Sequence, residues 1–329
     1  MTELQPQATP ASPPERIPVG ISHCLLGAEV RFNGGHKHSS LCTGTLGTLF
    51  AYVPFCPEVA IGMGTPRQAI RLVGDPTSPR VVGTRDASLD VTEPLQREGS
   101  TALARHPELR GFILMQKSPS CGMERVKVYD DDGNRPPEAA GSGAFAAALM
   151  RSDPLLPVEE EGRLNDPVLR ENFVTRVIIY AQWRALLEAG LSAGALVEFH
   201  TRHKYLLMAH QRDLYQAMGR LVAGFGQADH KEVAASYGAL LMQCLRTRAN
   251  RRSHSNVLQH MAGHFKRALG RAEKQELQEL IVQYRNGLVP LVVPMTLLKH
   301  HLLRHPDPFL LRQAYLQPHP AELSLRNAI

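Results

Sequence analysis

Residues 17 to about 150 alternate between short apolar runs and helix-like segments, and this alternation constrains the fold more than any other feature of the chain. The apolar runs are 17–22, 51–55 and 111–115, and the helix-like segments are 44–50, 92–106 and 141–150. Strands that alternate with helices form parallel sheets with helices on their faces. We therefore expect an α/β, Rossmann-like domain with a parallel sheet at residues 17–160.

The periodicity changes after residue 190, where apolar residues recur at the spacing of helices to the end of the chain. The helical stretches are 196–207, 214–224, 233–248, 255–269 and 271–286, followed by a helix through His300 and His301. This pattern predicts an all-α domain at 191–329. The segment 161–190 is also helical in its periodicity, and we interpret it as a helical linker. Residues 1–16, rich in Pro, Thr and Gln, predict a disordered tail.

Two classes of protein are disfavoured by what the chain lacks. It contains no run of about 18 uncharged apolar residues, which a membrane-spanning helix needs. Its first residues lack the basic start and apolar core of a secretory signal. We expect a cytoplasmic protein without a membrane partner.

Charge is unevenly distributed between the two halves. Residues 190–329 carry 18 Lys and Arg against 9 Asp and Glu, whereas residues 1–189 carry 19 against 22. The net charges are therefore +9 and −3. A basic unit joined to a mildly acidic one suggests a polyanion-binding unit beside a catalytic unit. A solvated basic helix face explains the same composition, and charge alone does not separate the two interpretations.

The five cysteines, in a chain without an export signal, do not indicate a disulfide framework. Cys24, Cys56 and Cys121 each lie at or just beyond the end of a predicted strand. Ligands of open α/β sheets bind at the carboxyl ends of the strands, so these thiols could converge. Three thiolates are fewer than a structural zinc site uses, but they could hold three irons of a cubane cluster and leave the fourth open. Incidental buried thiols are the alternative, and we assign Cys42 and Cys244 to that class.

Polar residues next to two of these cysteines could supply acid–base chemistry. Glu58 lies two residues after Cys56, and Ser118 and Ser120 precede Cys121. Arg67 and Arg71 are cations available to an anionic ligand. The alternative is structural, with an ion pair between Glu58 and Arg67 and turn hydrogen bonds from the serines.

Two sets of sequence stretches resemble known families. Stretches 21–27, 30–37, 55–59, 65–67 and 117–122 resemble the thiouracil desulfidase (TudS-like) family, in order and over nearly all of residues 17–150. Stretches 198–205, 283–290 and 294–301 resemble the YbgA-like domain. The pairing of the two is similar to that of tRNA 4-thiouridine desulfidases.

The first resemblance implies a [4Fe-4S] cluster held by Cys24, Cys56 and Cys121. The implied reaction is non-redox: water replaces the thiocarbonyl sulfur, which leaves as sulfide. The acid–base pair of the family maps onto Glu58 and Ser118, and we expect Ser120 and Arg67 to contact the substrate. His23 and Asn33 depart from the family pattern, which affects details of the pocket and not the cluster.

The second resemblance and the basic half imply that the substrate is 4-thiouridine in tRNA, and the cations that we expect to contact it are Lys204, Arg251, Arg252 and Lys299. Such clusters bind phosphates with little sequence preference. One alternative is a desulfidase of free thiouracil or thiouridine nucleotides. Others are an iron–sulfur RNA-binding sensor without catalysis and a zinc- or iron-dependent hydrolase of a small molecule.

Overall fold

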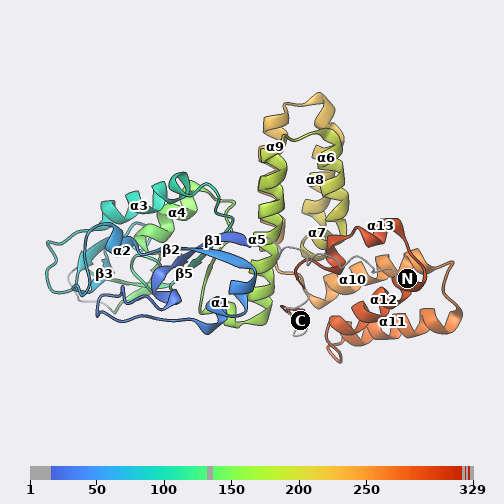
Figure 1. The fold of residues 1–329 in the computed structure, drawn as a ribbon, viewed down its shortest axis with the longest axis horizontal. Coiled ribbons are helices and arrows are strands. Elements are labelled where there is room, and N and C mark those ends of the chain that lie inside the picture. The colour runs from blue at the N-terminus through green and yellow to red at the C-terminus, as the bar shows by residue number, and fades with distance from the viewer. Residues whose placement is uncertain (1–15, 132–135, 321–322, 324, 327–329) are drawn as a thin grey trace, which may run out of the picture.

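A computed structural model describes residues 16–131, 136–320, 323 and 325–326 of the 329-residue chain. The tail predicted to be disordered lies, except for Arg16, outside the described residues. The strands occupy one end of the molecule and most of the helices occupy the other (Figure 1). This arrangement confirms the predicted class, an α/β part followed by an all-α part.

The first sheet has four parallel strands in the order β2-β1-β5-β8. They are β1 (Ile17–Ser22), β2 (Phe50–Phe55), β5 (Phe112–Leu114) and β8 (Val158–Glu160). In β1, Val19 and Ile21 are fully buried, as expected for β-branched residues in a sheet covered on both faces. Gly20 allows close packing, because a Cβ there would lie 2.3 Å from the ring of Phe112.

The connecting helices are α1 (Ser40–Thr43), α2 (Pro57–Ala60), α3 (Thr92–Arg105) and α4 (Ala144–Ser152). The helices α3 and α4 pack closely against each other, since a Cβ at Gly99 would meet the backbone of Phe145 at 2.3 Å. The helix predicted at 44–50 is wrong. Only a 3-10 turn, Leu46–Thr48, forms there, because two glycines and two β-branched threonines interrupt this segment.

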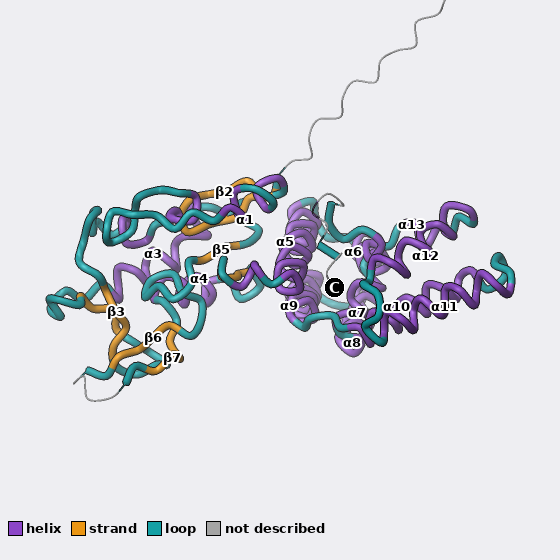
Figure 2. Tube along the Cα trace, turned by 90° about the horizontal axis from the view of Figure 1, so that it is seen from below, coloured by secondary structure: helices purple, strands orange, loops and turns teal. Residues whose placement is uncertain are grey.

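A second sheet, in the order β4-β3-β6-β7, was not predicted. Its strands are β3 (Ile70–Val73), β4 (Arg80–Gly83), β6 (Val126–Tyr129) and β7 (Glu138–Gly141). The pairs β3–β4 and β6–β7 are antiparallel, and β3 pairs with β6 in parallel. Leu72, Val81 and Val126 pack with Leu95 of α3 and Ala144 of α4 in a core of their own. Figure 2 shows β3, β6 and β7 apart from β2 and β5.

The C-terminal part contains helices and no strand within its described residues. Its helices are α6 (Ala193–Arg202), α7 (Lys204–His210), α8 (Arg212–Gly224), α9 (His230–Arg246), α10 (Arg251–Ala262), α11 (Arg271–Arg285), α12 (Val292–Arg304) and α13 (Pro308–Leu311). Asp229 caps α9 by accepting from two backbone N–H groups, which satisfies donors that a helix start otherwise leaves unpaired. None of the helices in the described residues is both long and apolar enough to cross a bilayer.

Helix α5 (Pro167–Glu188) lies between the two parts (Figure 1). Its first half packs Phe173, Val174 and Val177 against β1. Its second half places Tyr180 and Trp183 in the larger core, which includes residues of the C-terminal helices. The segment predicted as a linker therefore contains a helix that is buried against both sides.

Candidate active site

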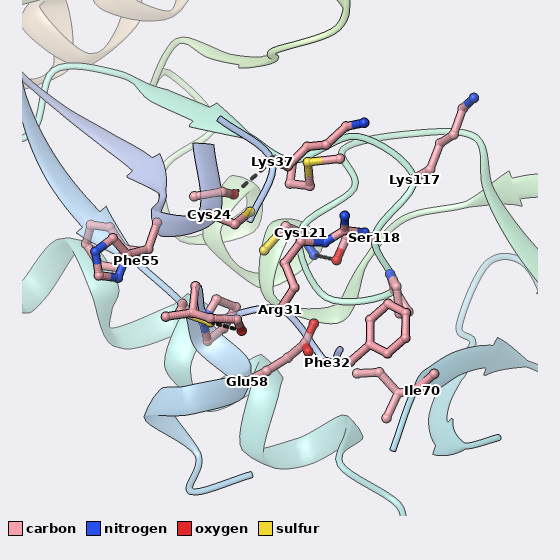
Figure 3. Close-up of a pocket in the computed structure, with 18 of the residues that line it drawn as sticks. Cys24, Arg31, Phe32, Lys37, Phe55, Glu58, Ile70, Lys117, Ser118 and Cys121 are labelled. Atoms are coloured by element: carbon pink, nitrogen blue, oxygen red, sulfur yellow. Dashed lines mark hydrogen bonds between the residues drawn. The ribbon is translucent and has the colours of Figure 1, made fainter. Parts of the chain in front are cut away.

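The three cysteines lie beyond the carboxyl ends of three neighbouring parallel strands. Cys24 belongs to a 3-10 turn directly after β1, Cys56 follows β2, and Cys121 lies in the loop after β5. Because the strand order is β2-β1-β5, three segments far apart in sequence meet at one edge of the sheet. All three thiols are free and line one cavity of about 430 Å³ (Figure 3).

Local structure fixes the positions of Cys121 and Cys56. The loop of Cys121 is attached to the start of α4, where the N–H groups of Gly143, Ala144 and Ala146 donate to carbonyls of residues 119–122. A side chain at Gly143 would not fit, since its Cβ would lie 2.5 Å from the carbonyl of Ser120. Cys56 stands at the N-cap of α2, followed by Pro57.

Burial disfavours ionisation of these thiols. It raises the pKa of Cys24 to about 11, with a contribution from Cys56 and an opposing one from the cation Arg31. It also raises the pKa of Cys56, while backbone N–H groups of α2 and Arg67 act in the opposite direction. The pKa of Cys121 is raised as well, by burial first and by the charge of Glu58 second. A cationic partner is what would favour three thiolates here, as a metal does for its ligands.

The carboxylate of Glu58 accepts hydrogen bonds at both of its oxygens. Its Oε2 accepts from Nε of Arg67 at 2.8 Å and from Nη2 at 2.6 Å. The other Arg67 hydrogens go to the carbonyls of Val30 and Gly64 and to the hydroxyl of Thr65. With 5% of its side chain exposed, Arg67 lines the cavity but has no N–H left for another acceptor. The ion pair considered as the structural alternative is therefore present.

A chain of hydroxyls connects the cavity to the second oxygen of Glu58. Ser120 is fully buried, is absent from the cavity lining, and donates its hydroxyl hydrogen to Glu58 Oε1. Ser118 lines the cavity, and its Oγ lies 3.2 Å from that of Ser120. Because the one hydroxyl hydrogen of Ser120 is used by Glu58, Ser118 is the donor in this contact. The result is a directed path, Ser118 to Ser120 to Glu58.

The turn hydrogen bonds of the serines are present as well. Ser118 Oγ accepts from the backbone N–H of Cys121 at 3.0 Å and of Ser120 at 3.3 Å. The same side chain therefore shapes the Cys121 loop and begins the path to Glu58. Structural and chemical interpretations of these serines are compatible.

Three cations on the cavity wall were not singled out from the sequence: Arg31, Lys37 and Lys117. Lys37 is held beside Cys24, whose carbonyl accepts from the Lys37 backbone N–H at 2.9 Å (Figure 3). The signal available in the sequence for Arg31 and Lys37 was the glycine-containing loop at 30–37, and for Lys117 it was the stretch 117–122 that contains Cys121. Phe55, Ile70 and Met115 are among the apolar residues of the wall.

The cations predicted to bind RNA lie elsewhere. Lys204, at the start of α7, places its Nζ 5.3 Å from the ring of Tyr205, and Arg251 and Arg252 are exposed at the start of α10. Burial and the nearby Arg326 lower the pKa of Lys299 on α12. None of the four lines the cavity, and neither does Arg71, which lines the neighbouring groove.

Cys42 and Cys244 are fully buried and lie outside the cavity. Cys42 belongs to the buried cluster that contains Val19 and Ile21 of β1, and the Cys244 thiol donates to the carbonyl of Leu207. Within the described residues, no group of three or more His, Cys, Asp or Glu side chains is arranged to hold a single metal ion. An iron–sulfur cluster requires a different arrangement, in which each thiolate binds its own iron. Cys24, Cys56 and Cys121, on the wall of one cavity, fit that donor set.

Comparisons with known proteins divide the chain in the same way. Residues 19–161 match the model of a family described as 2-thiouracil desulfurase. Residues 204–320 match that of a family described as a protein of unknown function, DUF1722.

Two curated relatives and one solved structure are similar to parts of the chain. The uncharacterized protein YbgA of Escherichia coli (strain K12) is 32% identical over 159 residues, which cover 48% of this chain and 94% of the relative. The uncharacterized protein YbbK of Bacillus subtilis (strain 168) is 33% identical over 153 residues, 44% of this chain and 97% of the relative. A solved [4Fe-4S]-dependent thiouracil desulfidase, TudS, is 32% identical with a TM-score of 0.38, covering 46% of this chain and 95% of its own.

Proposed function

Because the chain belongs to the 2-thiouracil desulfurase family through residues 19–161 and to the YbgA-like DUF1722 family through residues 204–320, we propose that it desulfurates 4-thiouridine in tRNA. Water would replace the thiocarbonyl sulfur, so that the products are uridine and sulfide. The observation that carries the proposal is a three-cysteine cavity with an adjacent carboxylate, in a chain whose second half is strongly basic. The reaction would take place in the cytoplasm.

The cofactor that we propose is a [4Fe-4S] cluster bound by Cys24, Cys56 and Cys121. When bound, it would supply a Lewis acid with an affinity for the soft thiocarbonyl sulfur and for the sulfide product. The match of residues 19–161 to the 2-thiouracil desulfurase family and the three cysteines on one cavity wall support it. Arg31 would complement the charge of the thiolates, since it already opposes the effect of burial on the pKa of Cys24.

Glu58 is the general base in this proposal. Both of its oxygens accept hydrogen bonds, from Arg67 and from Ser120, as a carboxylate does. It lines the cavity, so it can accept the proton of the attacking water directly. The alternative route uses the serines: Ser118 takes the proton from the cavity side, and each hydroxyl passes its own hydrogen on until one reaches Glu58.

Arg67 is a positioning residue and not a substrate contact in this mechanism. Its five N–H groups all have acceptors, and they connect Glu58 with the loops at 30 and 64–65. Ser120 likewise acts from behind the cavity wall. The apolar residues Phe55 and Ile70 offer surfaces for a pyrimidine ring, while Lys37 and Lys117 are exposed cations suited to phosphate.

The test compares substrates at equal concentration. Anaerobically reconstituted protein is incubated with thiolated tRNA, free 4-thiouracil and 4-thiouridine monophosphate, and the loss of thiocarbonyl absorbance is followed with sulfide release. We expect tRNA to be the preferred substrate by kcat/KM. Efficient turnover of the free compounds without turnover of tRNA would refute the RNA assignment and leave the desulfidase assignment intact.

A desulfidase of free thiopyrimidines is the second candidate. It is favoured by one observation: residues 19–161 alone match the family described as 2-thiouracil desulfurase, so this match does not involve the other half of the chain. The basic helical half has no evident use in turnover of a free base, and this is why tRNA is preferred.

A further inference from the structure

The cavity of the cysteines continues into a second groove. Ile70, Gln116, Lys117 and Pro119 line both. The second groove, of about 740 Å³, runs over the sheet β4-β3-β6-β7, whose strands β3 and β6 contribute to its lining. Its volume is in the range of about 300–1,000 Å³ that holds ligands the size of a nucleotide. A substrate with its base among the cysteines therefore has room for a neighbouring nucleotide here.

The groove is rich in cations that are only partly neutralised. Arg71, Lys117, Arg125, Lys127 and Arg163 line it together with two carboxylates, Glu124 and Glu160. Glu124 pairs with Arg163 at 2.7 Å and with Arg125 at 2.9 Å. Lys117 and Lys127 are exposed and have no ion-pair partner among the residues that the structure describes. The excess of positive charge is suited to a polyanion.

Two of these cations occupy unusual backbone conformations. Among the described residues, Lys117 (φ 59°) and Arg125 (φ 55°) are the non-glycine residues with positive φ. Such conformations are uncommon for residues with a side chain and concentrate at functional sites. Both residues line this one groove.

An aromatic ring accompanies the cations. Tyr129 is half-buried on β6, two positions from Lys127 and therefore on the same face of the strand. The guanidinium carbon of Arg71 lies 5.3 Å from the ring centroid of Tyr129. Arg71 Nε is buried and has no hydrogen-bond partner in the described part of the chain. Aromatic rings beside cations form the surfaces on which single-stranded RNA stacks its bases.

The groove also leads towards the helical part. Arg163 lines both this groove and a further cleft of about 600 Å³. The cleft is lined by Arg246 and Arg248, at and just beyond the end of α9, by the buried Arg176 of α5, and by two carboxylates, Asp153 and Glu159. The three hollows therefore follow one another from the cysteines to the basic half, through shared residues.

We propose that the RNA strand carrying the thiolated nucleotide follows this series of hollows. Its thiolated base enters the cysteine cavity, and a neighbouring nucleotide lies over the second sheet, with its base near Tyr129 and its phosphates near Arg125 and Lys127. The strand continues past Arg163 to the cleft beside α9. This inference rests on the proposed function, because it assumes an RNA substrate.

The test removes two groove cations and compares RNA with free base. The variant is Arg125→Gln/Lys127→Gln, and the control is Arg97→Gln/Arg105→Gln, which removes the same charge from exposed positions on α3, outside the groove and outside the basic half. Each variant, as reconstituted holoenzyme, is assayed with thiolated tRNA over a range of KCl concentrations and with free 4-thiouracil.

For the groove variant we expect kcat/KM on tRNA to fall about tenfold. The slope of log kcat/KM against log KCl concentration should become shallower by about 1.4, which is about 0.7 for each of the two single-strand phosphates that are no longer neutralised. Turnover of free 4-thiouracil should match the wild type, and the control should match it on both substrates. Equal behaviour of groove variant and control on tRNA would overturn the path, as would an equal loss on tRNA and on free base. Failure of the wild type on tRNA, with free base still converted, would instead overturn the proposed function and the path with it.

Discussion

The substitution Glu58→Gln tests the chemistry of the site with little change in shape. In the wild type, Oε2 accepts two hydrogen bonds from Arg67 and Oε1 accepts one from Ser120. A glutamine can keep its oxygen towards Arg67 and donate its amide hydrogens to Ser120, which then turns its own hydrogen towards Ser118. The variant therefore keeps its partners but reverses the hydroxyl path and loses the base.

The expected loss follows from what a general base contributes. Such groups accelerate reactions by about 10²–10⁴-fold, so kcat should fall by that factor, equivalent to about 2.7–5.4 kcal/mol of transition-state stabilisation. The cluster should persist, because Glu58 is not one of its proposed ligands. The assay is single-turnover loss of thiocarbonyl absorbance on thiolated tRNA, normalised to iron and acid-labile sulfide.

Ser120→Ala, which breaks the hydroxyl path and leaves Glu58 with Arg67, is the companion variant. A loss of kcat comparable with that of Glu58→Gln would mean that the proton of the attacking water travels through the two serine hydroxyls. Near-normal kcat would mean that this proton passes directly to Glu58. If Glu58→Gln with a full cluster turns over within about threefold of the wild type, well short of what a general base contributes, the carboxylate is not the base.

Three further predictions concern the cluster, the ion pair and acid stability. Cys121→Ala should abolish visible absorbance and acid-labile sulfide after reconstitution, whereas Cys42→Ala should keep both, because Cys121 lines the cavity and Cys42 does not. Arg67→Met leaves the carboxylate of Glu58, which is 15% exposed, without its cation. It should lower the free energy of unfolding of the N-terminal part by about 3–5 kcal/mol, measured in urea. The double variant Glu58→Gln/Arg67→Met should recover part of this stability. Burial lowers the pKa of His200 from 6.5 to about 4. The folded protein therefore holds this imidazole neutral while the unfolded chain protonates it, so the fold has its full stability above pH 6.5 and loses stability as the pH falls towards 4. The loss should be about 2 kcal/mol at about pH 5, measured as a shift in thermal midpoint that His200→Gln removes.

Each of these has an outcome that would contradict it. Loss of absorbance in Cys42→Ala would mean that the ligands are assigned wrongly. Additive effects of the Glu58 and Arg67 substitutions would mean that the two side chains are not coupled. An exposed histidine, His260, provides the control for acid stability: if His260→Gln flattens the pH dependence as much as His200→Gln, burial is not its cause.

Much of the fold could be predicted where the signal is local. The strand expected at 17–22 has those bounds in the structure, and the helix expected at 92–106 differs from α3 by one residue. The second sheet was missed because its strands have four residues each and only partial burial, so they lack a clear apolar run. The helix expected at 44–50 was wrong because the glycines there weaken a helix more than its few apolar residues can stabilise it.

For the site, the sequence by itself determined which cysteines lie at strand ends. Cys24, Cys56 and Cys121 could be selected because a parallel sheet collects the ends of its strands at one edge, whatever its strand order. The contact of Glu58 with Ser120 was decided only by the tertiary structure, since the two residues are 62 positions apart. Hydrogen bonds depend on distances and angles that form after the loops are packed, and a sequence pattern carries no such geometry. The groove could not be predicted from the sequence for the same reason. Its cations are scattered along the chain from Arg71 to Arg163, and the packing of two sheets brings them together.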